Sequence, residues 1–532
     1  MQMILIIAGV IAAFLIGSVV YIHISNQKVE RRLRQNFGKI PANRSIDLGD
    51  IAVYHDLNPC GIDDITWDDL DMDRVFRRIN VCLSSVGEEY LYHALHDLKT
   101  DFTDIEKREK LIDWLDENPD DRVKIQKILY GLGKQQGNGL CTFLSYAESG
   151  KLRHTWIYII LALIPVISIL LIPFFGRPVI FFMFWVLLFN TYMNTRIRKK
   201  IDHNFDTIRY ITALIHCAKS LDKKYGERIN LSEILKPLRK IGGLVSGMSQ
   251  RATSDLDTFA IIFKTIFYID IINYNRNVKK IIRHRDELFQ LYKIIGEAEV
   301  ALCVNSYRHS LDFYCVPEFH GDNIVSFREA YHPLLSDPVP NSADITNDSI
   351  ITGSNASGKS TFIKMIAINH ILAQTINTCC AESYKLSYSY VASSMALRDD
   401  IISGDSYFVT EVKSLKRIIE YCKERRCICF IDEILRGTNT KERIAASTAV
   451  LNLLHEMDGL CIVASHDIEL IEILDGVYDN YHFSETFENN TIEFDYLLKE
   501  GASRSTNAIK LLKYMGFDQR IIDEAVSMIK EI

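Results

Sequence analysis

A glycine-rich segment between an apolar strand and a helix constrains the fold of this chain more than any other feature. Residues 353–360 read GSNASGKS; they follow the apolar run Ser349–Thr352 and lead into a predicted helix. The pattern G-x-x-x-x-G-K-[ST] in this context is typical of a loop that binds phosphate groups. Its glycines let backbone N–H groups approach an anion, and the helix N-terminus adds partial positive charge. The residues predicted to hold a nucleotide are Gly353, Ser354, Asn355, Ala356, Ser357, Gly358, Lys359, Ser360 and Thr361.

Two residues of this loop have separate predicted tasks. Lys359 is expected to reach the β- and γ-phosphates, and the Ser360 hydroxyl is expected to bind Mg²⁺. The rival interpretation is a tight strand-to-helix turn without a ligand, which the complete motif disfavours.

Acidic residues and a histidine end two later apolar runs. Residues 429–433 read CFIDE, and residues 460–467 read LCIVASHD. Downstream of a phosphate-binding loop, Asp432 is expected to bind the metal through water and Glu433 to orient the attacking water. His466 is expected to contact the γ-phosphate; the plainer interpretation is a hydrogen-bonded residue at a strand end. Lys359, Glu433 and His466 are therefore predicted catalytic residues for hydrolysis of a nucleoside triphosphate.

The pattern of the chain changes near residue 325. Residues 25–153 and 197–320 are poor in proline and glycine and place apolar residues at three- and four-residue spacing, which predicts helices. After residue 325, short β-rich runs alternate with helices, which predicts a mostly parallel sheet covered on both faces. The predicted fold class is an α/β P-loop ATPase domain preceded by an all-α core or lever region.

Three uncharged runs are long enough to cross a bilayer as helices. Residues 1–24 contain no Asp, Glu, Lys or Arg, and the positive residues follow this run, which favours an uncleaved anchor over a signal peptide. Residues 156–175 and 179–195 are two further runs that only a Gly-Arg-Pro turn separates, so an antiparallel hairpin is expected. Buried core helices are the alternative for the pair, but clusters of charge bracket both runs.

The flanking charges predict the orientation of the hairpin. Lys151 and Arg153 precede it and four basic residues follow within 196–200, whereas its turn carries only Arg177. Positive residues stay on the cytoplasmic side, so residues 25–153 and all residues after 196 are expected inside. The predicted location is the inner (cytoplasmic) membrane, multi-pass, with a cytoplasmic ATPase domain.

Overall composition narrows the remaining classes of function. The net charge of −7 excludes a uniformly basic nucleic-acid coat, so any DNA contact must use a local patch. Twelve cysteines in 532 residues are too sparse for a disulfide scaffold, and most stand singly in apolar surroundings. They are expected to be buried and reduced.

The C-terminal half contains several motifs in a fixed order. Residues 352–361 read TGSNASGKST, residues 404–412 read GDSYFVTEV, and residues 432–440 read DEILRGTNT. These strings are similar to T-G-x-N-x-x-G-K-S-T, S-T-F-M-V-E-M and D-E-x-x-R-G-T-x-T of the MutS mismatch-repair ATPases, and from about residue 328 the chain resembles that family. A weaker similarity covers residues 84–91 and 331–335.

The resemblance implies an ABC/MutS-type ATPase that uses ATP and Mg²⁺. In that family a serine at the position of Ser406 reaches the γ-phosphate of the other subunit, so a homodimer through the ATPase domain is expected. Gln374 lies in a segment similar to the family's glutamine segment and is assigned to the nucleotide site on that basis. The units expected are a transmembrane anchor at 1–24, helical core at 25–153, a transmembrane hairpin at 154–196, helical core or lever at 197–325, the MutS-like ATPase domain at 326–500 and a helical dimerisation element at 501–532.

Departures from the family leave two functions open. The sequence shows no counterpart of the mismatch-reading domain or of the clamp insertion, and the aromatic residue that stacks on adenine is replaced near 338–341. The first hypothesis is a membrane-tethered ATPase that binds mismatched or branched DNA. The second is a membrane mechanochemical or regulatory ATPase that acts on a protein or lipid partner, the lipid bilayer included, without DNA. A basic run supports the first, although such a run is more often a solvated face or a lipid contact: Arg276, Lys279, Lys280, Arg283 and Arg285.

Overall fold

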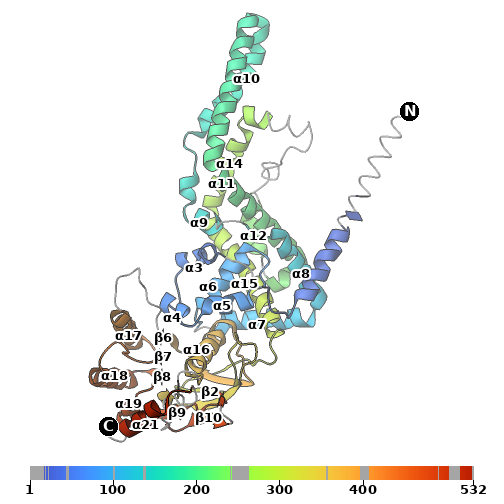
Figure 1. The fold of residues 1–532 in the computed structure, drawn as a ribbon. Helices are drawn as coiled ribbons and strands as arrows, with labels where there is room; N and C mark the ends of the chain where they lie inside the picture. The colour runs from blue at the N-terminus through green and yellow to red at the C-terminus, as the bar shows by residue number, and fades with distance from the viewer. Residues whose placement is uncertain are drawn as a thin grey trace.

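The chain forms an elongated molecule with an α/β domain at one end, a helical hairpin at the other and a helical core between them (Figure 1). This is a computed structural model. It describes residues 17, 20–21, 23–42, 47–99, 102–135, 139–229, 231–239, 241, 263–354, 357–395, 407–488, 491–502 and 516–529. Most of the predicted anchor at 1–24 lies outside the described residues.

Short and medium helices build the core. Before the hairpin these are α2 (Leu48–Ile51), α3 (Val53–Leu57), α4 (Asp64–Asp69), α5 (Met72–Ile79), α6 (Ser85–His96), α7 (Phe102–Glu117), α8 (Pro119–Leu132), α9 (Gly139–Ser145) and the 3₁₀ turn η1 (Ala147–Gly150). After the hairpin they are α12 (Ser232–Leu238), α14 (Ile269–Arg283) and α15 (Arg285–Arg308).

Helix α15 is the spine of the core and packs against α6. Each helix has a glycine at the contact, Gly87 on α6 and Gly296 on α15, and the absence of a side chain there allows the helices to approach closely. The buried carboxylate of Glu299 accepts hydrogen bonds from the N–H groups of Leu83 (2.7 Å) and Ser84 (3.2 Å). These bonds satisfy donors at the start of α6 and fix the helix against α15.

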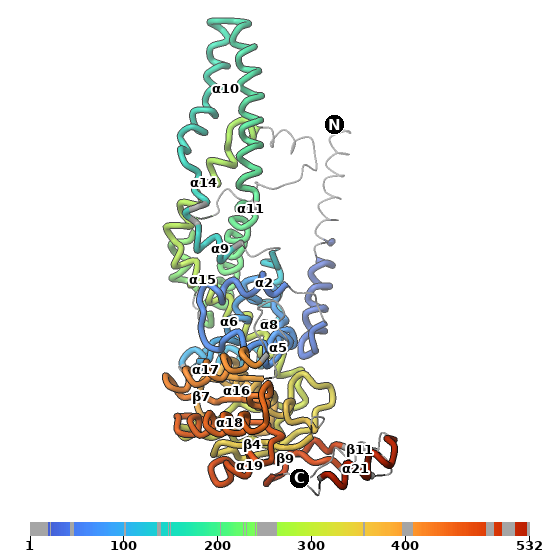
Figure 2. The backbone as a smooth tube through the Cα atoms, turned by 60° about the vertical axis from the view of Figure 1, so that its left-hand side comes forward, coloured from blue at the N-terminus to red at the C-terminus, as the bar shows by residue number. Residues whose placement is uncertain are grey.

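The hairpin consists of α10 (Thr155–Phe175) and α11 (Arg177–Ile229). Helix α11 continues far beyond the uncharged run, to a kink at the non-helical Tyr225, so the expected boundary at residue 196 falls inside one helix. Helix α14 lies alongside the lower part of the hairpin (Figure 2). Thr155–Phe175 and Arg177–Asp202 are long and apolar enough to cross a membrane by length and composition, and only 11% of each apolar window is buried.

Two sheets form the α/β domain. Its strands are β1 (Glu318–His320), β2 (Val325–Ala330), β3 (Asn341–Ile345), β4 (Ser349–Thr352), β5 (Ser383–Ser387), β6 (Tyr390–Ser394), β7 (Cys427–Asp432), β8 (Gly459–Ala464), β9 (Asp479–His482), β10 (Glu485–Glu488), β11 (Thr491–Phe494) and β12 (Lys499–Glu500). The larger sheet has the order β12-β9-β4-β8-β7-β6, and every pair from β9 to β6 is parallel. The smaller sheet, β1-β5-β2-β3, is mixed, and β10 pairs with β11 as a separate hairpin.

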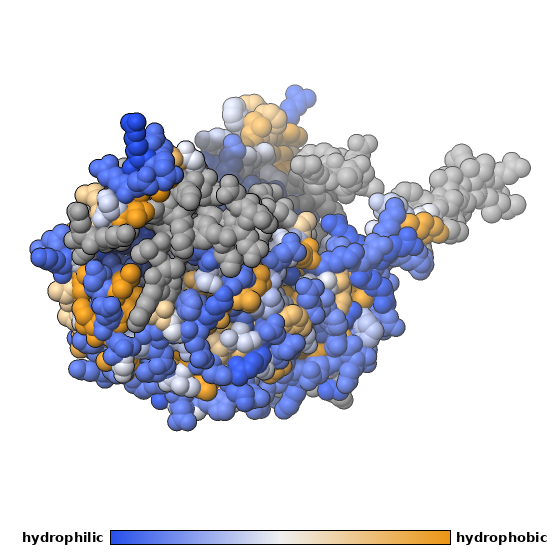
Figure 3. Space-filling model, turned by 60° about the horizontal axis from the view of Figure 1, so that its bottom comes forward, coloured by the Kyte–Doolittle hydropathy of each residue, from blue (hydrophilic) through white to orange (hydrophobic). Residues whose placement is uncertain are grey.

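Helices cover both faces of the larger sheet, as expected for parallel strands. The covering helices are α16 (Lys359–Ile376), α17 (Tyr407–Glu424), α18 (Thr440–His455) and α19 (Ile468–Ile473), and α21 (Gln519–Ile529) lies near the C-terminus. Alternate residues of β7 separate the two faces: Ile428 and Phe430 join the core that contains α16, whereas Cys429 and Ile431 pack with α17 and α18. The face at this end of the molecule is mostly hydrophilic (Figure 3).

Polar contacts join the helical core to the α/β domain. Lys364 of α16 forms an ion pair with Asp71 at 2.8 Å, and Arg417 of α17 forms one with Asp63. Helix α4 and the residues on either side of it therefore contact two helices that flank the sheet.

Candidate nucleotide site

The glycine-rich loop joins β4 to α16 at the carboxyl edge of the parallel sheet. Gly353 and Gly358 have φ angles of 140° and 99°, which side-chain-bearing residues rarely adopt. A Cβ on Gly353 would lie 2.7 Å from Ser357 Oγ and 3.0 Å from the Phe483 carbonyl oxygen. The loop thus needs glycine at this position both for its backbone angle and for space.

Lys359, the first residue of α16, folds back over the loop. Its Nζ donates hydrogen bonds to the carbonyl oxygens of Gly353 (2.7 Å) and Ser354 (2.9 Å), and its side chain is buried. Burial lowers the pKa of Lys359 to about 8, although the carboxylates of Glu433 and Asp432 act in the opposite direction. The loop therefore holds a cation whose charge is poorly solvated, which is the electrostatic requirement for binding phosphate.

Glu433 and His466 complete a chain of contacts with this lysine. His466 Nε2 lies 3.1 Å from Lys359 Nζ and 3.0 Å from Glu433 Oε1, and Arg436 pairs with the other carboxylate oxygen. Burial alone would raise the pKa of Glu433, but the hydrogen bond with His466 and the charges of Arg436 and Lys359 lower it below its usual value. Glu433 is therefore held as a carboxylate.

The loop after β7 has a strained backbone. Glu433 and Leu435 have φ angles of 58° and 56°, the left-handed region that is unfavourable for these residues. Two bonds hold this conformation: the Glu433 N–H donates to the Ala464 carbonyl at 3.0 Å, and the Leu435 N–H donates to the carboxylate of Glu411 on α17. The position of Glu433 thus depends on β8 and on α17.

Asp432 ends β7, and one oxygen of its carboxylate finds no donor among the described residues. The residue is 7% exposed, and its Oδ1 has no hydrogen-bond partner among the described residues. A buried carboxylate oxygen without a donor suits a hydrated cation, which supplies positive charge and water protons. Ser360 is exposed in the first turn of α16, next to Lys359.

A cavity of about 350 Å³ opens beside the loop. Gly358 and Thr361 form the side nearest the loop, and the ring of Tyr496 would lie 3.1 Å from a Cβ on Gly358. The walls combine apolar and polar side chains, with His332 half-buried among them; this partial burial lowers the pKa of His332 to about 4. The remaining lining residues are Leu335, Asp337, Pro338, Val339, Asn341, Phe362, Met365 and Phe483.

Some of the predicted site residues meet in the structure, and one does not. The fold brings together Gly353, Lys359, Glu433 and His466, but it does not bring Gln374 to them. Both ends of the Gln374 amide are bonded to the backbone of one residue, since Nε2 donates to the Ser389 carbonyl at 3.0 Å and Oε1 accepts from the Ser389 N–H at 3.2 Å.

Distance along the helix also separates Gln374 from the loop. It lies fifteen residues after Lys359 on α16, which corresponds to about 22 Å of helix. The assignment of Gln374 to the nucleotide site is therefore corrected: this side chain joins α16 to the turn before β6. Asn355, Ala356 and Ser406 lie outside the described residues.

Sequence reasoning missed two side chains of the site. Arg436 belongs to the D-E-x-x-R string, but only the fold shows that it pairs with Glu433. Glu411 lies near the start of α17, and only the tertiary structure brings it to the Leu435 N–H. The aromatic wall of the cavity was also missed, because Tyr496 follows the loop by more than a hundred residues.

Sequence comparison with known proteins identifies a domain in the C-terminal part of the chain. Residues 349–532 match the family model described as MutS domain V. The chain is 30% identical over 232 residues to the DNA mismatch repair protein MutS of Lactobacillus delbrueckii subsp. bulgaricus, which is 41% of this chain and 27% of that protein. It is 27% identical over 278 residues to the DNA mismatch repair protein MSH3 of Saccharomyces cerevisiae, which is 49% of this chain and 27% of the relative.

A third relative extends the match further. MutS protein homolog 4 of Mus musculus is 28% identical over 320 residues, or 56% of this chain and 32% of its own length. The chain thus spans less than a third of the length of each of these relatives. The domain model and the relatives at about this identity agree that the chain contains a MutS domain V at residues 349–532.

Proposed function

We propose that this chain binds and hydrolyses ATP with Mg²⁺ at the site between β4, β7 and β8. The observation that carries the proposal is the chain of contacts from Lys359 through His466 to Glu433, beside the unpaired carboxylate oxygen of Asp432. Phosphoryl transfer to water requires a cation over a glycine-rich loop, an ionised carboxylate and a carboxylate oxygen that is open to a metal ion, and the described residues supply all three.

Each group has one task in this proposal. The loop N–H groups and Lys359 bind the phosphates, Asp432 and Ser360 hold Mg²⁺, and Glu433 accepts a hydrogen bond from the attacking water. Mg²⁺, when bound, supplies positive charge at the phosphate oxygens. Because His466 and Arg436 contact both oxygens of Glu433, one of these contacts must open before the carboxylate meets water.

The cavity beside Gly358 is the proposed site of the base. It is continuous with the loop through Gly358 and Thr361, and Tyr496 and Phe483 offer aromatic rings in its walls. Aromatic and apolar walls around a few polar groups are typical of sites for planar ligands. In this chain Tyr496 thus takes the stacking position that residues 338–341 do not supply.

We propose that the ATPase domain moves the helical core when its nucleotide state changes. Lys364 lies one turn after Ser360 on α16 and pairs with Asp71, and Arg417 on α17 pairs with Asp63. A shift of α16 or α17 with nucleotide state would therefore move the segment between residues 63 and 71, and with it the core. The family's composite dimer, in which Ser406 faces the partner's nucleotide, is part of this proposal.

Glu433→Gln tests the assignment of the water-orienting residue. Hydrolysis should fall by about a hundredfold or more, because the amide cannot accept a proton, while ATP binding is kept. The measurement is phosphate release and fluorescent-nucleotide binding by the purified full chain in detergent, with light scattering for the dimer. Glu420→Gln, an exposed glutamate on α17, is the matched control and should behave like the parent.

Lys359→Ala separates binding from catalysis. It should abolish ATP binding, since the neighbouring carbonyl oxygens would then face the phosphates without a cation. Unchanged turnover in Glu433→Gln, or normal ATP affinity in Lys359→Ala, contradicts the assigned site.

We further propose DNA as the ligand of the helical core, in line with the mismatch-repair names of the relatives. The basic run identified in the sequence lies on α14 and the start of α15, where Arg276, Lys279, Arg283 and Arg285 are exposed. Anisotropy with perfect, mismatched and branched duplexes at two salt concentrations tests this proposal. Binding should weaken steeply with salt, and Lys279→Glu should reduce it, whereas the exposed Lys416→Glu on α17 should not.

The hairpin favours a second candidate, a membrane ATPase that never touches DNA. Apolar side chains of α10 and α11 are exposed along the hairpin, including Trp156 (59%), Phe174 (79%) and Phe181 (68%). An exposed apolar surface of this extent is typical of a lipid-facing helix pair. Helix α14, which carries most of the basic run, lies alongside the lower part of the hairpin (Figure 2), and the run would then contact lipid headgroups. Absence of DNA binding at low salt by an active ATPase would select this candidate.

A further inference from the structure

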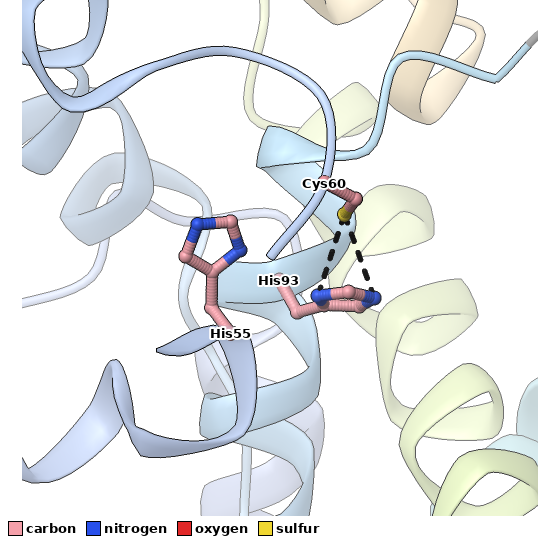
Figure 4. Close-up of side chains that lie close together, drawn as sticks. All are labelled: His55, Cys60 and His93. Carbon is pink, nitrogen blue, oxygen red and sulfur yellow. Dashed lines mark hydrogen bonds between the residues drawn. The ribbon is translucent and has the colours of Figure 1, made fainter. Parts of the chain in front are cut away.

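Three potential metal ligands converge in the helical core, far from the nucleotide site in the sequence. His55 lies on α3, Cys60 in the loop that follows, and His93 on α6 (Figure 4). One ligand atom from each lies within 4.8 Å of the other two. Cys60 Sγ is 3.7 Å from His93 Nδ1 and 3.9 Å from its Nε2.

The backbone fixes the cysteine in this position. Gly61 has a φ of 68°, and a Cβ there would lie 1.6 Å from the His96 carbonyl oxygen. The Ile62 N–H donates to that same oxygen at 3.0 Å. Because only glycine fits at this contact, the loop carrying Cys60 lies against the end of α6, on which His93 is located.

His55 has a buried nitrogen without a partner. The residue is 7% exposed, and its Nδ1 has no hydrogen-bond partner among the described residues. In Figure 4 the ring nitrogen nearer to Cys60 and His93 is the one bonded to the ring carbon that carries the side chain, which is Nδ1. On its other side the ring stacks on His96 at 4.0 Å, which in turn stacks on Trp67 at 3.6 Å. A buried nitrogen left unpaired is costly unless something binds it.

The surroundings of the three side chains are poorly solvated. Burial lowers the pKa of His93 to about 4 and also lowers the pKa of His55. Burial raises the pKa of the Cys60 thiol to about 12. A bound divalent cation would stabilise the thiolate form of Cys60, because its positive charge neutralises the buried negative charge of the sulfur.

We propose that His55, Cys60 and His93 bind Zn²⁺. With bond lengths of about 2.0–2.1 Å to nitrogen and 2.3 Å to sulfur, tetrahedral geometry requires about 3.6 Å between a nitrogen and a sulfur ligand. The 3.7 Å from Cys60 Sγ to His93 Nδ1 agrees with this requirement. Since Sγ is almost equidistant from both ring nitrogens, His93 must rotate about its Cβ–Cγ bond to direct one nitrogen at the ion.

The fourth ligand is water or Asp97. The charge of Asp97 acts on all three groups and favours protonation of each, which places this carboxylate near the site. Asp97 also pairs with Lys99 at 3.2 Å, so it would exchange that partner for the ion. One thiolate, two imidazoles and an oxygen are ligands that Zn²⁺ accepts.

The site would fasten the short N-terminal helices to the core. The loop that carries Cys60 leads directly to Asp63, the partner of Arg417 on α17. A zinc ion there would hold this segment on α6, and with it the contact between the core and the α/β domain. The proposal does not depend on ATP hydrolysis.

The experiment measures metal binding by the untagged, detergent-purified full chain. Elemental analysis should find about one zinc per chain, and X-ray absorption at the zinc edge should find one sulfur at about 2.3 Å with nitrogen or oxygen at about 2.0–2.1 Å. After removal of zinc with a chelator, added Co²⁺ should give a thiolate-to-cobalt charge-transfer band. A zinc shell of several sulfurs would overturn the proposal, because the ion would then lie among other cysteines.

Variants assign the ligands. Cys60→Ser and His93→Asn should each lower the affinity for Co²⁺ at least about tenfold. Cys315→Ser is the matched control, since Cys60 and Cys315 are the half-buried cysteines of the chain, and it should keep the parental band. A parental band in Cys60→Ser, or a folded parent that binds neither ion, overturns the proposal. The absorption measurement on the parent decides the matter even if a variant fails to fold.

Discussion

His466 joins two groups on which burial and neighbouring charge act in opposite directions. Burial lowers the pKa of Lys359 and would raise that of Glu433, while the opposite charges of the two groups, both in contact with His466 Nε2, stabilise each other. For Lys359 burial prevails, and for Glu433 the neighbouring charges prevail. The resting site therefore holds a lysine that loses its proton more easily than usual and a glutamate that stays ionised.

This balance predicts a pH dependence for nucleotide binding. The free protein has a Lys359 pKa of about 8, and bound phosphate stabilises the ammonium, so the pKa is higher in the complex. Affinity for ATP should therefore be constant below pH 8 and fall by up to about tenfold per pH unit above it, until the pKa of the complex is reached. Fluorescent-nucleotide titrations between pH 6.5 and 9.5 measure this effect.

A matched substitution separates Lys359 from other lysines. Lys416→Gln removes an exposed ammonium on α17 and should leave the pH profile unchanged. An affinity for ATP that stays constant across the whole pH range would contradict the lowered pKa of Lys359.

At the scale of elements, glycines set how closely the central helices of the core pack. A Cβ on Gly296 of α15 would lie 2.4 Å from Tyr90 Cγ, and one on Gly87 of α6 would lie 2.5 Å from Glu299 Cδ. Both contacts are shorter than carbon atoms tolerate, so the helices could not keep their separation with larger residues. The hydrogen bonds that Glu299 accepts from the start of α6 depend on this separation.

Gly296→Ala should therefore destabilise the core by about 1–3 kcal/mol, because the added methyl group forces the helices apart. The measurement is the thermal unfolding midpoint of the full chain in detergent. Gly131→Ala in α8 is the control: no atom lies within 4 Å of its added Cβ, and alanine is the better helix former by about 1 kcal/mol. A midpoint for Gly296→Ala equal to or above that of Gly131→Ala would show that the contact is not limiting.

At the scale of the whole molecule, the hairpin and the α/β domain lie at opposite ends (Figure 1). Asn190 within the hairpin is buried by protein, since its amide donates to the carbonyl oxygens of Leu161 (3.0 Å) and Ile266 (3.2 Å). Its polar group is thus satisfied internally, which membrane insertion requires. Beyond this level the apolar side chains of the hairpin face outward, and basic residues gather at its base.

We predict that the hairpin turn lies on the outer side of the membrane. Arg177→Cys at the turn should react with a membrane-impermeant maleimide on intact cells, whereas Lys200→Cys near the base should react only after permeabilisation. Native cysteines give a low background because most are buried, and the parent chain measures it. The reverse labelling pattern would contradict the predicted orientation.

The local features of this protein can be predicted from the order of its residues alone. Residues 352–361 specify a strand, a glycine-rich loop and a helix, because glycine conformation, apolar patterning and helix start all depend on neighbours along the chain. The same holds for the alternation of strands and helices after residue 325 and for the two long apolar helices.

Contacts between side chains that are distant along the chain could not be predicted and became visible in the fold. Glu411 contacts the Leu435 N–H, Tyr496 lines the cavity beside Gly358, and Gln374 bonds to Ser389 although a motif assigned it to the nucleotide. The proximity of His55 and His93 could not be predicted either, because no short-range pattern encodes a contact between α3 and α6. Such contacts depend on how helices pack and on which buried polar atoms find a partner, and both are properties of the folded chain as a whole.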